Sequence, residues 1–294
     1  MMELEGIYAP IPTAFKDEEI AYNKLKYNLE IWGRSKLDGL VVLGSNGEYV
    51  LLDEEEKVAL TAFVRENFPT DKPVIAGTGC ESTKATVRLT KRCAEAGADA
   101  VLVLNPSYYK SSMTNEALSR FYTEVADTSP VPVILYNMPR NTGINMSDQL
   151  VSELSKHPNI IGIKDSSGNI VQIAGILANS APEFSVFAGS GNFLYASLCL
   201  GASGGTLAVA NIFPDQCSHI VDYFKTGKYE EAKNIQFQIL EANAAVTSRW
   251  GVTGLKAAMD ILGYYGGEVR KPLLDLPTHN KDELKKILSK VVVV

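Results

Sequence analysis

The stretch NIIGIKDSSGN, residues 159 to 169, is an apolar run that ends on Lys164 and passes at once into polar, turn-forming residues. Similar short runs rich in Val, Ile and Leu recur along the chain between longer segments. Eight of them lie at residues 7 to 13, 39 to 45, 73 to 79, 100 to 106, 131 to 137, 160 to 166, 184 to 190 and 204 to 210. Because these runs are apolar throughout rather than alternating, they are typical of strands that are covered on both faces.

The segments between the runs are typical of helices. Residues 52 to 68 and 82 to 99, for example, have apolar residues at spacings of three and four and begin with acidic or hydroxyl residues. Strands that alternate with helices predict a parallel sheet. Eight such units predict a closed (β/α)8 TIM barrel, because an open doubly wound sheet usually has fewer strands and a different phosphate loop.

Strand signals stop after about residue 213, and residues 218 to 246 and 254 to 265 have helical patterns. We therefore expect a barrel over residues 1 to 213, with a final barrel helix that runs to about residue 226. A C-terminal helical region is expected over residues 214 to 294. The length of 294 residues fits this plan, since such barrels take about 250 residues.

The composition argues against several classes of protein. Hydrophobic residues make up 46% and charged residues 21% of the chain, a balance typical of globular proteins. The net charge of -6 and the absence of a Lys/Arg run argue against nucleic acid as a partner. No apolar stretch approaches the roughly 20 residues that span a bilayer, and the first residues do not resemble a signal peptide. We expect a cytoplasmic protein that has no contact with a membrane.

The cysteines and histidines follow no pattern that indicates a disulfide framework or a metal site. Cys80, Cys93, Cys199 and Cys217 lack the CxxC spacing, so reduced thiols are expected. The three histidines are scattered, and the predicted strand ends carry too few histidines and carboxylates for a metal cluster. The sequence therefore predicts neither a metal nor a cofactor.

Polar residues at the ends of the predicted strands are the candidates for chemistry, because the active sites of such barrels lie at the C-terminal rim. Lys164 ends the sixth run. An amine attacks a carbonyl carbon only when it is neutral, and burial at the rim would disfavour its charged form. The alternative is a structural lysine that reaches solvent or pairs with Asp165.

Two further features lie at strand ends. Tyr136 ends the fifth run, where its phenol could reach the same space as Lys164 and move protons; the alternative is a core tyrosine with a paired hydroxyl. The stretch GSNGE, residues 44 to 48, ends the second run, and its glycines allow backbone N–H groups to face a small anion such as a carboxylate. It is neither GxGxxG nor a P-loop, so it does not indicate a nucleotide site.

The stretches GSNGE, YNMPRNTG (residues 136 to 143) and IGIKDSSGN (residues 161 to 169) resemble, in order and spacing, three fingerprints of one superfamily. This is the dihydrodipicolinate synthase and N-acetylneuraminate lyase superfamily of class I pyruvate-type aldolases. The resemblance covers nearly the whole chain. It implies a barrel with a C-terminal helical region, a homotetramer built as a dimer of dimers, and a 2-oxo acid (pyruvate) and an aldehyde as small-molecule partners.

The resemblance also implies roles for individual residues. Lys164 matches the lysine that forms a Schiff base with pyruvate, and Tyr136 matches the tyrosine that relays protons. Ser45 and Asn46 match a pair in which the first hydroxyl links that tyrosine to solvent or substrate and the backbone helps to hold the pyruvate carboxylate.

Four other residues align less precisely with functional positions of the superfamily. Gly189 and Thr206 match strand-end positions that contact the pyruvyl group. Either Tyr108 or Tyr109 matches an aromatic residue that is offered to the relay of a neighbouring subunit.

Asn141 bears on the choice of substrate within the superfamily. The synthase members carry at this place an arginine that binds the carboxylate of the second substrate. Arg140 stands one residue earlier, where we expect its side chain to point elsewhere; the alternative is that Arg140 substitutes for the arginine that is missing at position 141. Residues 79 to 87, 141 to 143, 157 to 168 and 241 to 267 resemble the 4-hydroxy-2-oxoglutarate aldolase branch instead.

The expected function is therefore cleavage of 4-hydroxy-2-oxoglutarate, or a close 2-oxo acid, to pyruvate and glyoxylate. The alternative enzyme is 4-hydroxy-tetrahydrodipicolinate synthase, which condenses pyruvate with aspartate semialdehyde in lysine biosynthesis. An alternative from another class is a barrel that binds a 2-oxo acid without catalysis.

Overall fold

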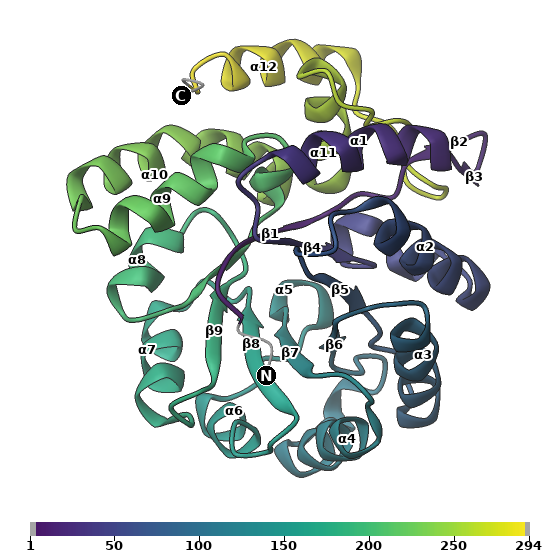
Figure 1. Ribbon diagram of the computed structural model, residues 1–294, viewed down its shortest axis with the longest axis vertical. Helices are drawn as coiled ribbons and strands as arrows, with labels where there is room; N and C mark the ends of the chain where they lie inside the picture. Colours follow the sequence, from purple (N-terminus) through teal and green to yellow (C-terminus); the bar gives the residue numbers. More distant parts are fainter. Residues whose placement is uncertain (1–3, 292–294) are drawn as a thin grey trace.

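Eight parallel strands close into a barrel with helices on its outside, which confirms the predicted fold class (Figure 1). The structure is a computed structural model that describes residues 4–291. Neighbouring strands in the barrel follow the order of the chain, and the last strand pairs with the first. The strands are β1 (Gly6–Pro10), β4 (Gly39–Val42), β5 (Val74–Gly77), β6 (Ala100–Leu104), β7 (Val133–Asn137), β8 (Ile160–Asp165), β9 (Ser185–Ala188) and β10 (Gly204–Thr206).

A helix follows each barrel strand and covers the outside of the barrel. The first turns of several helices are capped by side chains, as at α2, where Asp53 and Glu56 form a reciprocal capping box. The barrel helices are α1 (Tyr22–Arg34), α2 (Glu54–Asn67), α3 (Thr83–Glu95), α4 (Asn115–Thr128), α6 (Asp148–Leu154), α7 (Ile170–Asn179), α8 (Leu194–Cys199) and α9 (Pro214–Lys225). Short helical turns interrupt the loops at the rim: η1 (Ser45–Gly47), η2 (Tyr49–Leu51), η3 (Lys110–Ser112), α5 (Pro139–Thr142) and η4 (Ala208–Asn211).

Several strands end earlier than the apolar runs predict. The second run was expected to remain extended to residue 45, but β4 ends at Val42 and the chain turns into η1. The cause is the left-handed backbone of Leu43, whose φ of 61° is incompatible with a strand. The residues that follow the strands therefore form turns at the rim.

A small hairpin was not predicted from the sequence. Its strands β2 (Phe15–Lys16) and β3 (Glu19–Ile20) are antiparallel and have two residues each. Asp17 and Glu18 make the turn with positive φ values of 52° and 69°. Such short strands carry no detectable alternation of apolar and polar residues.

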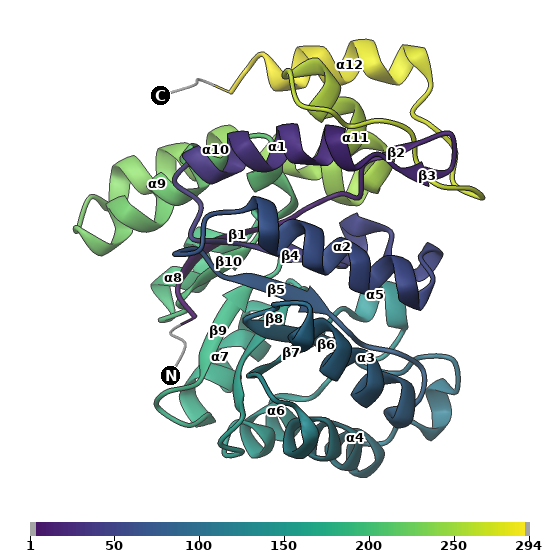
Figure 2. The ribbon, with the colours of Figure 1, turned by 45° about the vertical axis from the view of Figure 1, so that its right-hand side comes forward.

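The chain after α9 packs against one side of the barrel (Figure 2). It forms α10 (Tyr229–Ala244), a π-helical turn η5 (Ala245–Arg249), α11 (Gly251–Ile261) and α12 (Thr278–Leu288). The expectation of helices to the end of the chain is wrong for residues 262 to 277, which form loops and a bridge between Glu268 and Phe15. In both ribbon views α12 lies beyond α1 and α11, at the outer edge of the molecule (Figures 1 and 2).

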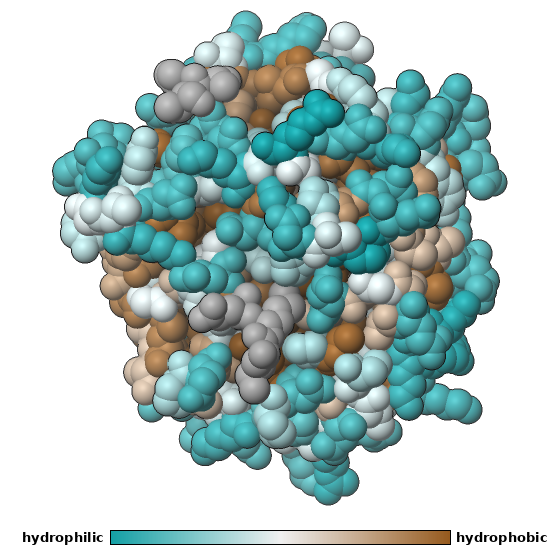
Figure 3. All heavy atoms as spheres, viewed as in Figure 1, coloured by the Kyte–Doolittle hydropathy of each residue, from teal (hydrophilic) through white to brown (hydrophobic). Residues whose placement is uncertain are grey.

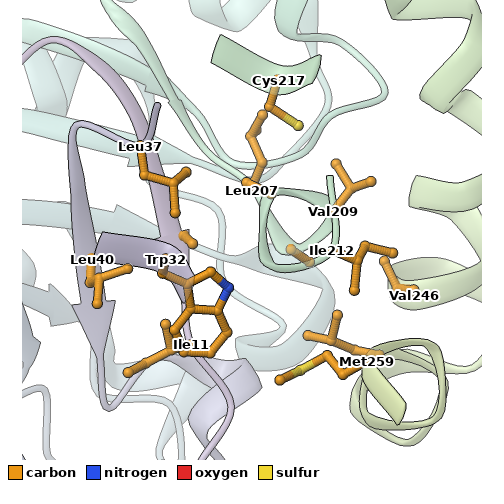
Figure 4. Close-up of a cluster of buried hydrophobic side chains, with 14 of the residues drawn as sticks. Ile11, Trp32, Leu37, Leu40, Leu207, Val209, Ile212, Cys217, Val246 and Met259 are labelled. Atoms are coloured by element: carbon orange, nitrogen blue, oxygen red, sulfur yellow. The ribbon is translucent and has the colours of Figure 1, made fainter. Parts of the chain in front are cut away.

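The C-terminal region shares a hydrophobic core with the barrel (Figure 4). Trp32 of α1 is fully buried in this core and donates a hydrogen bond from Nε1 to the carbonyl of Asn211 at 3.0 Å. Val246 of η5 and Met259 of α11 belong to the same cluster of buried side chains. Burial of this apolar surface holds η5 and α11 against the rim of the barrel.

The outer surface is mainly hydrophilic on the face drawn in Figure 3, with smaller hydrophobic areas between polar side chains. No helix within residues 4–291 is both long and apolar enough to cross a membrane. Cys80, Cys93, Cys199 and Cys217 are free thiols, as expected.

Candidate active site

A cavity of about 550 Å³ lies at the rim of the barrel. Its wall is formed by strand ends, by η1 and α5, and by η5 and the start of α11. The residues that the sequence indicates and that line this cavity are Ser45, Asn46, Tyr136, Asn141, Lys164, Gly189 and Thr206. The structure thus brings together residues from six separate loops and strand ends in a space that is large enough for a small organic acid.

Lys164 lies on β8 and is buried, with 4% of its surface exposed. It pairs in register with Tyr136 of β7, and its Nζ atom lies 4.3 Å from the centre of the tyrosine ring. Within residues 4–291 the Nζ atom of Lys164 has no carboxylate partner. An amine of this kind is desolvated and faces a cavity, as a nucleophile requires.

Asp165 does not pair with Lys164, so the structural alternative for the lysine does not hold. Successive side chains of a strand point to opposite faces. The Asp165 carboxylate accepts hydrogen bonds from the Asn137 amide at 2.8 Å and from the Gln172 amide at 3.1 Å. It also accepts one from the backbone N–H of Ser167 at 2.9 Å. The carboxylate is thus used to fix the turn that follows β8.

Tyr136 connects Lys164 to the GSNGE loop. Its ring packs in the hydrophobic interior of the barrel, and 4% of its surface is exposed. Its hydroxyl lies 3.3 Å from the Ser45 hydroxyl, at which either group can donate. Lys164, Tyr136 and Ser45 therefore lie in a row, in which Lys164 contacts the tyrosine ring and Ser45 contacts the tyrosine hydroxyl.

Contacts from outside η1 fix the shape of the GSNGE loop. The Thr13 hydroxyl donates to the carbonyl of Gly47 at 2.7 Å, and the Asn46 amide donates to the carbonyl of Pro10 at 3.3 Å. Glu48 ends the turn in the left-handed region, with φ of 54°. Because the first backbone N–H groups of a helical turn have no partner inside it, Ser45 and Asn46 present donors at the edge of the cavity.

Tyr49 is a neighbour of this row that the sequence did not indicate. Tyr49, Ser45 and Tyr136 line a small apolar space that adjoins the main cavity. Burial raises the pKa of the Tyr49 phenol, with smaller contributions from Tyr136 and Cys80. The Tyr49 hydroxyl therefore remains protonated beside the row.

Gly189 and Thr206 form the side of the cavity beyond Lys164. The N–H of Gly189 donates to the carbonyl of Asp165 at 2.7 Å. A Cβ atom at Gly189 would collide with the Ser166 side chain and with that same carbonyl. Glycine is therefore required for the close approach of β9 to the turn after Lys164.

Tyr108 and Tyr109 lie outside the cavity of the single chain. Their rings pack edge to face at 5.1 Å, and 78% and 71% of their surfaces are exposed. The Glu81 carboxylate accepts hydrogen bonds from the backbone N–H groups of Ser107 and Tyr108, both at 2.9 Å, and so fixes the loop. Their contact with a neighbouring subunit stays a prediction.

Arg140 lines the same cavity as Asn141, so the expectation that its side chain points elsewhere is wrong. Both residues belong to α5, a single turn that begins at Pro139. The Arg140 guanidinium extends away from α5 and donates from Nη2 to the carbonyl of Ser248 in η5 at 3.0 Å. A long side chain can thus reach the cavity from a position that a short one could not.

The C-terminal region contributes part of the wall that sequence reasoning did not foresee. The residues concerned are Val246, Thr247, Ser248, Gly251 and Val252. The sequence signal that covers these residues is the resemblance of residues 241 to 267 to the 4-hydroxy-2-oxoglutarate aldolase branch, which was not connected to the cavity.

Asn243 connects this region to the loop after β9. It is fully buried, its amide donates to the Ser190 hydroxyl and to the Asn192 side-chain oxygen, both at 2.9 Å, and its own oxygen accepts from the N–H of Gly191 at 3.2 Å. Ser190 and Asn192 line the cavity. Asn243 therefore fixes part of the cavity wall from behind.

No group of three or more His, Cys, Asp or Glu side chains within residues 4–291 has the arrangement of a metal site. The cavity holds the buried amine of Lys164, the hydroxyls of Tyr136 and Ser45, the guanidinium of Arg140 and several neutral polar groups. This set can form an imine with a carbonyl substrate and can transfer protons to and from it.

Comparison with known proteins agrees with this chemistry. The model of the Dihydrodipicolinate synthetase family matches residues 3–291. A probable mitochondrial 4-hydroxy-2-oxoglutarate aldolase from Emericella nidulans is 36% identical over 293 residues, which cover 98% of this chain and 94% of that relative. A 4-hydroxy-tetrahydrodipicolinate synthase from Caldicellulosiruptor saccharolyticus is also 36% identical, over 97% of this chain and 96% of its own.

Among solved structures, YagE superimposes with a TM-score of 0.93 over 99% of both chains, at 28% identity. YagE is a prophage protein of the dihydrodipicolinic acid synthase family from E. coli K12, and its structure holds pyruvate.

Proposed function

The chain belongs to the dihydrodipicolinate synthetase family and is a class I pyruvate-dependent lyase, and from this premise we propose that it cleaves 4-hydroxy-2-oxoglutarate to pyruvate and glyoxylate. The observation that carries the proposal is the burial of Lys164 and its position at the cavity. Its amine is buried, lies 4.3 Å from the Tyr136 ring and faces the cavity. The members of this family use pyruvate and an aldehyde.

In the proposed mechanism the neutral amine of Lys164 attacks the 2-oxo carbon of the substrate. The carbinolamine that forms loses water and becomes a protonated Schiff base. Loss of the proton from the 4-hydroxyl then breaks the bond between C3 and C4, and the electron pair of that bond moves into the iminium. Glyoxylate leaves, the remaining enamine takes a proton at C3, and water releases pyruvate and the free lysine.

Tyr136 and Ser45 are proposed to move the protons in these steps. The two hydroxyls are 3.3 Å apart, and the tyrosine ring lies against Lys164. A proton can thus pass between the reacting centre and the edge of the cavity. In the same proposal Ser45 and Asn46 hold the carboxylate next to the 2-oxo group with their backbone N–H groups, while Gly189 and Thr206 contact the pyruvyl carbons.

The choice of aldehyde is the finer part of the proposal. It is supported by the 36% identity to the aldolase of Emericella nidulans and by the neutral side chain of Asn141 on the cavity wall. The second candidate, 4-hydroxy-tetrahydrodipicolinate synthase, is supported by an equal identity to the enzyme of Caldicellulosiruptor saccharolyticus. Steady-state turnover with 4-hydroxy-2-oxoglutarate, and with pyruvate plus aspartate semialdehyde, distinguishes the two candidates.

The Asn141→Arg variant is a sharper test of the interpretation of this position. The variant is expected to gain synthase activity from a low starting level. High synthase activity in the unaltered enzyme, with no effect of the substitution, would contradict our use of Asn141.

A homotetramer, built as a dimer of dimers, remains part of the proposal. The large exposed rings of Tyr108 and Tyr109 support it, because exposed aromatic groups favour association.

We also propose that the barrel unit ends near residue 226 and that the protein is cytoplasmic. The name of the Emericella relative includes the word mitochondrial, so fractionation of the source cells is the measurement that decides the compartment.

Incubation with pyruvate and borohydride tests the mechanism directly. Reduction of the Schiff base adds a stable pyruvyl-derived group, which intact mass and peptide mapping should locate on Lys164. The Lys164→Met variant is expected to remain unmodified. Modification of another lysine, or of none, would contradict the Schiff-base mechanism.

A further inference from the structure

The charge of the cavity differs from that of the whole chain. The protein has a net charge of -6, yet Lys164 and Arg140 are the basic residues among those that line the cavity within residues 4–291, and no carboxylate lines it. A guanidinium on the wall of a concave site that lacks carboxylates concentrates a positive potential there. Such a site favours a ligand with two negative groups, or with one negative group and a reactive carbonyl.

The two basic side chains occupy different environments. Lys164 is buried at the end of β8, whereas Arg140 is exposed on α5. Nζ of Lys164 packs against the Tyr136 ring, and Arg140 reaches across to η5. Lys164 therefore belongs to the reacting centre, and Arg140 belongs to the part of the cavity that is closed by the C-terminal region.

The Arg140 side chain is held in place but its charge is not neutralised. Its bond is to a backbone carbonyl, that of Ser248 at 3.0 Å, and it has no carboxylate partner within residues 4–291. An arginine has five N–H donors in a planar fork, which matches the geometry of a carboxylate. One donor fixes the fork against η5, and the others remain available for a ligand.

The neighbouring Arg249 offers a contrast within the same turn. Arg249 pairs with Glu283 at 2.7 Å and stacks on the Trp250 ring at 4.3 Å. It does not line the cavity. Of the two arginines that meet at η5, Arg140 is therefore the one with an unpaired charge and access to the ligand space.

We propose that Arg140 binds a second, distal carboxylate of the substrate and so makes the enzyme selective for aldehydes that carry an acid group. This inference rests on the proposed function, since it assigns the end of the substrate that lies away from Lys164. Arg140 then determines specificity, whereas Asn141 beside it provides at most a neutral contact. Neutral aldehydes of similar size have no carboxylate to pair with the guanidinium, so the site selects against them.

A binding experiment with unreactive acids tests this inference separately from the Schiff base. Glutarate carries two carboxylates, whereas pentanoate has the same number of carbons and carries one, and neither has a 2-oxo group. By calorimetry the unaltered enzyme is expected to bind glutarate roughly 10-fold or more tightly than pentanoate, as a charge-assisted hydrogen bond would provide. Arg140→Met should abolish this preference, while Arg249→Met, which changes an arginine outside the cavity, should retain it.

Kinetics with a matched pair of substrates provides the second readout. For 4-hydroxy-2-oxoglutarate, Arg140→Met is expected to lower kcat/KM by roughly 10- to 100-fold, mainly through KM. For 4-hydroxy-2-oxopentanoate, in which a methyl group replaces the distal carboxylate, kcat/KM should not change. Arg140→Lys should recover part of the loss.

Three results would overturn the inference. They are an equal affinity of the unaltered enzyme for glutarate and pentanoate, a preference that survives in Arg140→Met, and a preference that is lost in Arg249→Met. Failure of pyruvate to modify Lys164 would count against the proposed function alone, because the binding of glutarate requires no Schiff base.

Discussion

Glu48 and Lys256 form an ion pair, 2.5 Å between Oε1 and Nζ, in which 1% and 2% of the respective side chains are exposed. Glu48 ends the GSNGE loop, and Lys256 lies on α11, so the pair joins the loop that carries Ser45 to the C-terminal region. Each partner has a further bond: the N–H of Arg270 donates to Glu48 at 2.8 Å, and Lys256 donates to the carbonyl of Glu268 at 2.6 Å. Burial lowers the pKa of Lys256, and the charge of Glu48 opposes that shift.

Removal of one member of this pair should destabilise the protein strongly. Lys256→Met leaves the Glu48 carboxylate buried without its cation, which is expected to lower the free energy of unfolding by roughly 3 to 5 kcal/mol. Urea denaturation followed by circular dichroism measures the change.

The double variant Glu48→Gln/Lys256→Met is the matched control for this measurement. It removes both charges and should lose clearly less stability than Lys256→Met alone. An equal or larger loss in the double variant would show that lost packing, rather than an unpaired charge, dominates at this site.

The hydroxyl of Tyr136 should matter for turnover rather than for binding. Tyr136→Phe keeps the ring against Lys164 but removes the group that lies 3.3 Å from the Ser45 hydroxyl. We expect kcat to fall by roughly 100-fold or more, with a small change in KM and no large change in melting temperature. Steady-state kinetics on 4-hydroxy-2-oxoglutarate measures both constants.

Tyr122→Phe provides a control for the loss of a buried phenol. The Tyr122 hydroxyl donates to the carbonyl of Val103 at 3.2 Å, away from the cavity. This variant is expected to lose some stability and to keep its kcat. If Tyr136→Phe and Tyr122→Phe have the same kcat, the proton-relay role of Tyr136 is wrong.

Glu54 should make the stability of the protein depend on pH in the acid range. Hydrogen bonds from Arg88 and Arg92 lower the pKa of the Glu54 carboxyl from 4.5 to about 2. A carboxyl whose pKa is lower in the folded state stabilises that state above its unfolded pKa, and the stabilisation disappears as the pH falls through the folded pKa.

The difference in unfolding free energy between the unaltered protein and Glu54→Gln is therefore expected to be roughly 1 kcal/mol at pH 7, because solvent screens this partly exposed cluster. It should decline between pH 4.5 and pH 2. Glu116→Gln breaks an exposed pair with Arg120 and should show a much smaller difference at every pH. A constant difference for Glu54→Gln across this range would contradict the assignment.

The strands of this barrel were predictable because a strand that is covered on both faces must be apolar along its length. The ends of the strands were less predictable. Leu43 is as apolar as the strand before it, and only its φ of 61° ends β4. The positions of Lys164 and Tyr136 followed from their places at the ends of neighbouring strands.

The route of the Arg140 side chain did not follow from local sequence. Its partner, Ser248, is 108 residues away. The pairing of Glu48 with Lys256 likewise depends on how the C-terminal region packs, and neither a motif nor a periodicity reports such contacts.

Asn243 should affect the shape of the cavity through the loop after β9. Its amide donates to Ser190 and to Asn192, both at 2.9 Å, and it accepts from the N–H of Gly191 at 3.2 Å. Asn243→Ala leaves the buried N–H of Gly191 without this partner and should lower the free energy of unfolding by roughly 1 to 3 kcal/mol. Because Ser190 and Asn192 line the cavity, KM for 4-hydroxy-2-oxoglutarate should rise while pyruvate still modifies Lys164 in the presence of borohydride.

Asn179→Ala is the control for this prediction. It removes an exposed bond to the carbonyl of Gly175 and should leave KM unchanged. An equal effect of both substitutions would mean that Asn243 acts on general stability and not on the cavity wall.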